Sequence, residues 1–201
     1  GQGIKDQDTN MHLNITNTLN YIHTIGKDHH VNLMLGQEGQ KNINNKTYLS
    51  ASNYPVDNLR ELYNAAIPNS ASTLKEELVL ASFFANAQYD YADKYYASAS
   101  WRYDGSSRFG KNNRWATFWS AGLKYRISSE RFMESTRNWL SNLTLRTSYG
   151  TSGNQEVGNS WYASRDLFGY GDNYNNQPGM AHDRFGNDNL KWEQTNKFNF
   201  R

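Results

Sequence analysis

Apolar and polar residues alternate through four consecutive stretches of the chain. Odd-numbered positions carry aliphatic and aromatic residues, while the even-numbered positions carry many Asn, Gln, Ser, Lys and Arg residues. The four stretches span about 79–91, 95–103, 115–127 and 139–149. A period of two indicates β-strands, because successive side chains in a strand point to opposite faces. Each stretch is about 9–13 residues long, which suits a tilted strand that crosses a bilayer better than a soluble strand of about 5–6 residues.

Three weaker stretches bring the expected number of strands to seven. The first runs from about 11 to 23, the second follows a turn near Gly26 and continues towards 42, and the last begins near Leu190. The long connections are expected at about 44–75, with a short helix over 58–66, and at about 151–189. Membrane barrels have short periplasmic turns and long extracellular loops. We therefore expect the loops near 58, 108 and 170 outside the cell and the connections near 27, 93 and 133 in the periplasm.

Aromatic residues gather near both ends of these strands. One group lies beside the short turns, namely Tyr89, Tyr91, Tyr95, Tyr125 and Trp139. The other group lies at the opposite strand ends, namely Trp101, Tyr103, Trp115 and Tyr149. Amphipathic rings are enriched at both surfaces of a membrane, so two such belts favour a membrane barrel. The alternative is that aromatic residues favour strands in general.

The bulk composition excludes a helical membrane protein. Mean hydropathy is −0.90 and 37% of the residues are hydrophobic, so no stretch approaches the ~18 apolar residues of a membrane-spanning helix. A barrel keeps a low average hydropathy because half of each strand faces water. The net charge of +2 comes from dispersed basic residues, which argues against a nucleic-acid partner. The chain has no cysteine, which excludes disulfides and thiol chemistry.

The expected fold is all-β, an antiparallel segment of a transmembrane β-barrel with about seven strands. Bacterial single-chain barrels have an even number of strands, and an open sheet would expose unpaired backbone groups to lipid. We therefore expect residues 1–201 to form an internal part of a larger barrel domain.

The sequence gives little support for a catalytic site or a metal site. The stretch Asp104–Arg108 is flanked by strands rather than followed by a helix, so we interpret it as a turn and not as a phosphate-binding loop. His29 and His30 are neighbours in a strand and should point to opposite faces, which prevents them from sharing a metal ion. We expect no catalytic residue, no metal site and no cofactor.

Aromatic residues in the loop 151–189 are candidates for contact with a substrate. Sugars stack their C–H faces on aromatic rings, and the surrounding Asn, Asp and Gly residues suit hydrogen bonding to hydroxyls. The candidates are Trp161, Tyr162, Tyr170 and Tyr174. The same residues would equally serve to pack a large loop against itself or against a partner, and we favour that structural role.

Five basic residues occupy even positions and are expected to face the barrel lumen. They are Arg102, Arg114, Lys124, Arg126 and Arg146. They are candidates for lining a transport path. The alternative, which we favour, is that they form ion pairs across strands or with a domain that fills the barrel.

A set of short motifs is more specific than the alternation. In chain order these are RYDGSSRFG (102–110), NRWATF (113–118), RFM (131–133), WLSNL (139–143), GNQ (153–155) and NLKWE (189–193). In this order and spacing the chain closely resembles the SusC/RagA class of TonB-dependent outer-membrane transporters from Bacteroidota. The resemblance is strongest over about 76–201.

The resemblance implies a 22-stranded barrel in the bacterial outer membrane, surrounded by lipid and filled by an N-terminal plug that lies outside this chain. Such proteins import oligosaccharides or peptides with energy relayed by TonB, which contacts a segment outside this chain. They pair with a SusD-like surface lipoprotein and are not enzymes. The alternatives are a lectin-like glycan-binding sheet and another kind of outer-membrane barrel.

Overall fold

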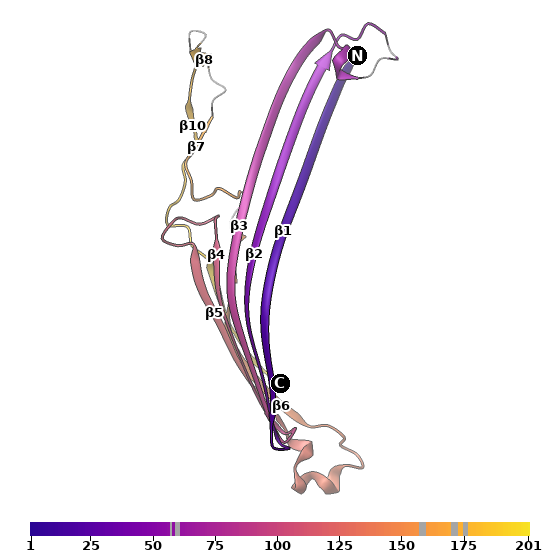
Figure 1. The fold of residues 1–201 in the computed structure, drawn as a ribbon, viewed down its shortest axis with the longest axis vertical. Helices are drawn as coiled ribbons and strands as arrows, with labels where there is room; N and C mark the ends of the chain where they lie inside the picture. The colour runs from indigo at the N-terminus through magenta and orange to yellow at the C-terminus, as the bar shows by residue number, and fades with distance from the viewer. Residues whose placement is uncertain (57, 59–60, 157–159, 170–172, 175–176) are drawn as a thin grey trace. The chain divides into compact units, whose positions relative to one another are not determined.

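A single seven-stranded sheet dominates the structure. The computed structural model describes residues 1–56, 58, 61–156, 160–169, 173–174 and 177–201 (Figure 1). The strands are β1 (Gln2–Ile25), β2 (His29–Ser52), β3 (Ile67–Tyr91), β4 (Tyr95–Ser106), β5 (Trp115–Arg126), β6 (Thr144–Asn154) and β11 (Glu193–Phe200). They follow one another in the sheet in the order β1-β2-β3-β4-β5-β6-β11. The all-β class, the mostly antiparallel arrangement and the seven strands of the sheet are therefore confirmed.

The other elements are short. Two small hairpins lie between β6 and β11, one pairing β7 (Leu167–Gly169) with β10 (Ala181–Arg184) and one pairing β8 (Asn173–Tyr174) with β9 (Gln177–Pro178). The part of the chain that the structure describes also contains three 3-10 helices: η1 (Leu62–Asn64), η2 (Ile127–Ser129) and η3 (Arg131–Thr136). Among the described residues, no helix has the length and apolar character needed to cross a membrane.

The first three strands are longer than the alternation predicts. We expected a loop over about 44–75, but β2 continues to Ser52 and β3 begins at Ile67, so the connection is 53–66. Alternation of apolar and polar residues reveals a strand only when one of its faces is apolar, and these added segments carry polar residues on both faces. Of the short helix expected over 58–66, the described residues form only η1, and positions 59 and 60 lie outside the described residues.

Three boundaries in the second half of the chain also differ from the prediction. β6 begins at Thr144 rather than near 139, because 127–143 forms η2, η3 and an irregular segment. The loop expected over 151–189 begins later, since β6 continues to Asn154, and it contains the two hairpins. The last strand begins at Glu193 rather than near Leu190.

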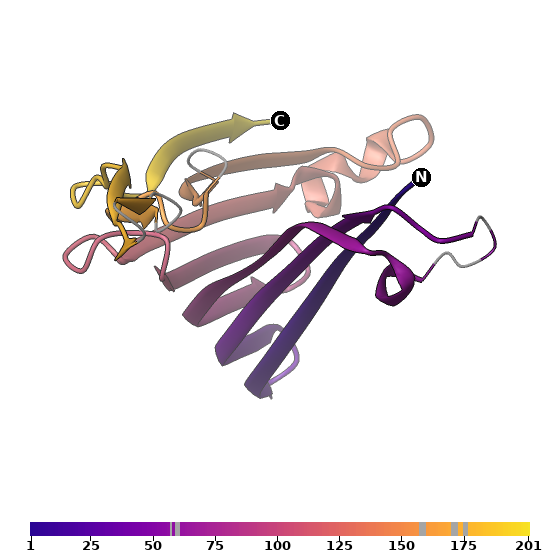
Figure 2. The same cartoon turned by 90° about the horizontal axis from the view of Figure 1, so that it is seen from above.

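The second compact unit consists of residues 15–39 and 80–201. In it the strands β3, β4, β5, β6 and β11 pair in a register that places residues of the same face opposite one another. Figure 2 shows β4, β5, β6 and β11 side by side in one layer. We call the end of these strands that carries the tight turns 26–28 and 92–94 and the connection 127–143 the turn end. The opposite end, which carries 107–114 and 155–192, is the loop end.

One face of this unit is apolar and exposed. Leu123, for example, keeps 62% of its side-chain surface accessible. Rings stack near both ends of the strands: Tyr95 on Tyr125 with centroids 4.9 Å apart at the turn end, and Tyr103 on Trp115 with centroids 4.7 Å apart towards the loop end. The eight residue-to-residue steps from Tyr95 to Tyr103 span about 27 Å along β4. That length matches an apolar band of about 25 Å crossed by a tilted strand.

The first compact unit, residues 1–14 and 40–79, contains the outer parts of β1, β2 and β3. Ser50 and Ala51 are buried there, and Gln2 Nε2 donates a hydrogen bond of 3.1 Å to Ser50 Oγ. Glu77 accepts ion pairs from Lys41 at 3.2 Å and from Lys75 at 2.9 Å. The Gln2–Ser50 and Lys41–Glu77 pairs join neighbouring strands, and such cross-strand polar pairs help to hold together a sheet segment that has little apolar surface to bury.

Glu130 holds the connection 127–143 against the ends of β4 and β5. Its carboxylate accepts hydrogen bonds from Tyr95 Oη at 2.8 Å and Lys94 Nζ at 3.1 Å, and a longer one from Tyr125 Oη at 3.4 Å. The Tyr95 hydroxyl and the Lys94 ammonium group hold the pKa of Glu130 below its usual value. A carboxylate with a lowered pKa stabilises the folded arrangement at neutral pH, and this contribution is lost as the pH falls through that lowered value.

We predict that Glu130→Gln loosens the connection 127–143 at pH 7. The substitution should also remove the loss of stability that this connection shows as the pH falls from 7 to about 3, a value below the usual carboxyl pKa. Hydrogen exchange of the full-length protein, expressed as protection factors, measures this. Glu134→Gln is the matched control, because Glu134 lies in the same connection and is exposed. Equal protection in Glu130→Gln and the unsubstituted protein would contradict the role of Glu130.

Candidate functional site

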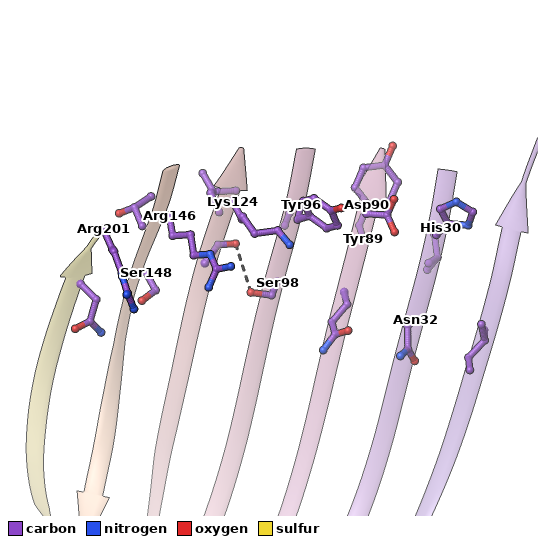
Figure 3. Close-up of a pocket in the computed structure, with 18 of the residues that line it drawn as sticks. His30, Asn32, Tyr89, Asp90, Tyr96, Ser98, Lys124, Arg146, Ser148 and Arg201 are labelled. Carbon is purple, nitrogen blue, oxygen red and sulfur yellow. Dashed lines mark hydrogen bonds between the residues drawn. The ribbon is translucent and has the colours of Figure 1, made fainter. Parts of the chain in front are cut away.

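A row of large polar side chains crosses the polar face near the turn end. Asp90 on β3 pairs in register with Tyr96 on β4, Tyr96 with Lys124 on β5, and Lys124 with Arg146 on β6. The main chain of Arg146 in turn exchanges two hydrogen bonds with Arg201, at 2.7 and 2.9 Å. Figure 3 shows these five side chains on neighbouring strands of one face. We call them the polar row.

A hollow of about 710 Å³ lies along the polar row. The next row towards the loop end is formed by shorter side chains and a glycine: Gln88, Ser98, Gly122, Ser148 and Asn199. Ser98 Oγ donates to the carbonyl oxygen of Gly122 at 3.4 Å. Because this row fills little space beside the long side chains of the polar row, the surface is hollowed between them (Figure 3).

The charge of the polar row is unbalanced. Lys124, Arg146 and Arg201 lie on consecutive strands, and among the described residues none of them forms a salt bridge. Lys124 Nζ lies 3.5 Å from the ring centroid of Tyr96, a cation–π contact that holds the ammonium group without neutralising it. Like charges directly opposite each other across strands destabilise a sheet. These three cations give their side of the hollow a positive charge.

Asp90 ends the row on the other side. Its Oδ1 atom is buried and has no hydrogen-bond partner within the described structure. The hollow thus has a tyrosine between one carboxylate and three cations, and beyond Asp90 it continues to His30 on β2 and Thr24 on β1.

The five basic residues expected to face the lumen divide into two groups. Lys124, Arg126 and Arg146 lie near the turn end, where the Arg126 guanidinium is 5.9 Å from the Tyr96 ring. Arg102 lies on β4 towards the loop end, where it forms two hydrogen bonds with Asp104 at 3.1 and 3.2 Å. Arg114 also lies at the loop end, and its Nε atom donates to the carbonyl oxygen of Phe109. Among the described residues, the three at the turn end form no cross-strand ion pair, and pairing with a domain that fills the barrel stays a prediction.

A cluster of three aromatic side chains packs at the loop end. Phe109 and Phe118 are 1% and 6% exposed, and Trp192 contacts both, with ring centroids 5.1 and 5.6 Å away. The Trp192 indole donates a hydrogen bond of 2.9 Å to the carbonyl oxygen of Arg114. A Cβ atom at Gly110 would overlap the carbonyl oxygen of Asp188. These contacts fasten the segment before β11 to the turn between β4 and β5.

The turn expected over Asp104–Arg108 begins only at Ser107, because Asp104–Ser106 still belong to β4 and pair with neighbouring strands. Ser106 Oγ accepts a hydrogen bond from the backbone N–H of Arg108 at 3.3 Å, and Arg108 Nη1 donates to the carbonyl oxygen of Gln155 at 2.8 Å. Arg108 is only 7% exposed. Its guanidinium group is therefore used to hold the start of the long loop.

The aromatic candidates of the long loop are only partly described. Trp161 and Tyr162 are half-buried in a turn, where the Arg165 guanidinium lies 5.8 Å from the Tyr162 ring. Arg184 Nη2 donates to the carbonyl oxygen of Tyr162 at 3.3 Å. Tyr170 lies outside the described residues, as does the side chain of Tyr174.

Three other rings of this loop form a cluster that the sequence alone did not predict. His182 stacks on Phe185 with centroids 3.8 Å apart and meets Phe168 edge-on at 5.0 Å. Phe185 is 80% exposed. The pairing of β7 with β10 brings Phe168 and His182 together, and no spacing rule in a glycine-rich loop indicates that pairing.

His29 and His30 lie on opposite faces of β2, which confirms the prediction for neighbouring residues of a strand. The His29 ring contacts Tyr91 at 4.7 Å, while His30 lines the hollow of the polar row. Within the described ranges, no three His, Cys, Asp or Glu side chains gather as metal ligands.

The chain matches the family model described as TonB dependent receptor-like, beta-barrel, over residues 2–200. The chain belongs to this family. It is 34% identical over 186 residues to TonB-dependent receptor P39 of Formosa agariphila, which covers 92% of the chain and 18% of that protein. It is 36% identical over 126 residues to TonB-dependent receptor SusC of Bacteroides thetaiotaomicron, which covers 60% of the chain and 12% of that protein.

The solved structure of the RagAB peptide transporter matches this TonB-dependent receptor segment over 98% of its length. The TM-score is 0.90 and the sequence identity is 30%. The segment covers 22% of the solved chain, and it spans about a fifth of the length of P39. The suspected resemblance is thereby confirmed, and the protein is located in the bacterial outer membrane. The family is one of receptors and transporters rather than of enzymes.

We predict that Phe109→Ala opens the long loop 155–192 of this receptor. Removing a fully buried phenylalanine side chain costs about 3–5 kcal/mol, and here the cost falls on the contacts with Trp192. Limited proteolysis of the full-length protein in outer membranes should therefore cleave the loop at least tenfold faster. Phe132→Ala is the control, because Phe132 is 68% exposed. Equal cleavage rates in the two variants would contradict the proposed anchoring.

Proposed function

We propose that the protein is a TonB-dependent importer that carries oligosaccharides or peptides across the outer membrane together with a SusD-like surface lipoprotein. The observation that carries the proposal is the match of 98% of the chain to the RagAB peptide transporter at 30% identity. The identity to SusC, at 36% over 126 residues, supports the same class. A soluble lectin-like sheet is less consistent with the exposed apolar face, which would be a liability in water.

In this proposal the loop end faces outwards and the turn end faces the periplasm, since membrane barrels have long outer loops and short periplasmic turns. The apolar face contacts lipid and the polar face lines the barrel interior. A substrate or the lipoprotein would first meet the long loop, whose sequence contains Trp161, Tyr162, Tyr170 and Tyr174. The exposed ring of Phe185 adds a further stacking surface there. TonB acts through a segment outside this chain.

The test is depletion of a defined substrate mixture by intact cells. A pectin hydrolysate supplies acidic and neutral oligosaccharides, and a casein digest supplies acidic and neutral peptides. Mass spectrometry follows which members disappear from the medium. We expect cells with the full-length protein to deplete a subset that cells lacking its gene leave untouched, and we expect loss of TonB to have the same effect as loss of the gene.

Restoring the full-length gene is the control and should recover depletion of the subset. Identical depletion by cells with and without the gene would contradict the importer function. Surface binding of the subset without uptake, unchanged by loss of TonB, would favour a glycan-binding or peptide-binding protein instead.

A further inference from the structure

A row of four aromatic rings crosses the apolar face at the turn end, and we call it the aromatic row. His29 on β2 contacts Tyr91 on β3, with ring centroids 4.7 Å apart. Tyr91 contacts Tyr95 on β4 at 6.2 Å, and Tyr95 stacks on Tyr125 of β5 at 4.9 Å. The residue opposite Tyr125 on β6 is Leu145. The aromatic row therefore stops at β5.

The connection 127–143, which joins β5 to β6, is held where the aromatic row stops. Glu130 accepts hydrogen bonds from the hydroxyl groups of Tyr95 and Tyr125, at 2.8 and 3.4 Å. Since these two rings stack on the apolar face, Glu130 fixes the start of η3 at the rim of that face. Figure 1 shows the coiled part of this connection beyond the turn end of the strands.

This contact does not depend on an open edge of the sheet. β4, β5 and β6 lie inside the sheet, with β3 on one side of them and β11 on the other. In the proposed barrel the polar face lines the interior, so a domain that fills the barrel meets that face. The rim of the apolar face instead has lipid as its neighbour.

η3 divides its side chains between a packed side and an exposed side. In a 3-10 helix, residues three positions apart lie above one another. Met133 and Thr136 form such a pair and are half-buried, and Thr136 Oγ1 donates to the carbonyl oxygen of Met133 at 2.8 Å. Phe132 is turned away from this pair by about a third of a turn and is 68% exposed. The helix thus presents a large apolar ring on its open side.

The length of the chain limits how far Phe132 lies from the apolar band. Tyr95 stands at the turn-end border of that band, and Phe132 follows its partner Glu130 by two residues. Two residues span at most about 7 Å. The headgroup layer beside the hydrocarbon core of a bilayer is about 5–8 Å thick. The main chain at Phe132 is therefore within reach of this layer, in which the apolar side chains of interfacial helices are buried.

We propose that the connection 127–143 is a membrane-surface anchor, with the Phe132 ring in the phospholipid headgroup layer of the periplasmic leaflet. This inference rests on the orientation given with the proposed function, in which the turn end faces the periplasm. Phe132 continues the aromatic row over β6, where the sheet itself carries Leu145. Arg131 is exposed beside it, and its guanidinium group suits a lipid phosphate. Glu130 is the positioning residue.

The test is light-induced crosslinking of the full-length protein in native outer membranes. A benzophenone-bearing phenylalanine replaces Phe132 or, in the matched control, Arg137. Arg137 is also exposed in this connection, but it lines a hollow together with Arg126 of the polar face. Mass spectrometry distinguishes a phospholipid adduct from a crosslink to protein. We expect at least tenfold more phospholipid adduct at position 132 than at position 137.

Adding Glu130→Gln should lower the yield of phospholipid adduct at position 132 at least threefold, because the connection is then no longer held at the aromatic row. Glu134→Gln is the control for this substitution and should leave the yield unchanged, since Glu134 is exposed and lies in the same helix. The comparison of positions 132 and 137 stands alone if Glu130→Gln fails to reach the outer membrane.

Three results would overturn the inference. The first is a benzophenone at position 132 that crosslinks to protein, whether another part of the chain or a separate partner, rather than to phospholipid. The second is an equal yield of phospholipid adduct at positions 132 and 137. The third is a yield at position 132 that Glu130→Gln does not lower in folded protein. None of these involves a substrate, so a failure of import contradicts the proposed function without changing the crosslinks.

Discussion

Backbone hydrogen bonding is the constraint on which the structure depends. Lipid offers no partner to a backbone N–H or C=O group, so a segment that crosses a membrane must satisfy these groups internally or through neighbouring strands. The registers of β3 with β4, β4 with β5, β5 with β6 and β6 with β11 do this through continuous ladders. Side chains are then free to divide between an apolar face and a polar face. The polar row exists because the ladders align even positions of β3, β4, β5 and β6 with Arg201, an odd position that follows β11.

The strands that could be predicted are those whose two faces meet different surroundings. β4 and β5 appear at their expected places, because Trp101, Leu123 and similar residues alternate with serine and basic residues there. Sequence reasoning failed where both faces carry polar residues, as in β2 beyond about 43 and in the first part of β3, since alternation carries no signal there. It also failed at 139–143, where a chance alternation of Trp139 and Leu143 lies in an irregular connection.

The candidate site was predictable only in part for a related reason. Lys124 and Arg146 could be placed on the polar face from their parity alone. Their alignment with Asp90, Tyr96 and Arg201 depends on the register between strands, which turn lengths and the connection 127–143 determine. The loop end illustrates the same limit, because Phe109 and Trp192 are 83 positions apart and meet only through folding. The motifs that contain them could be recognised, but their contact could not be derived from spacing.

The central claim is that β4 crosses the membrane with odd positions towards lipid and even positions towards the barrel interior. The chain has no cysteine, so single cysteines introduced from 95 to 104 into the full-length protein, in a background free of other cysteines, can be labelled with a polarity-sensitive fluorophore. Quenching by a lipid-bound nitroxide in outer-membrane vesicles is the direct measurement. We predict strong quenching at 97, 99 and 101 and weak quenching at 98, 100 and 102. Quenching that does not alternate with a period of two would contradict the account.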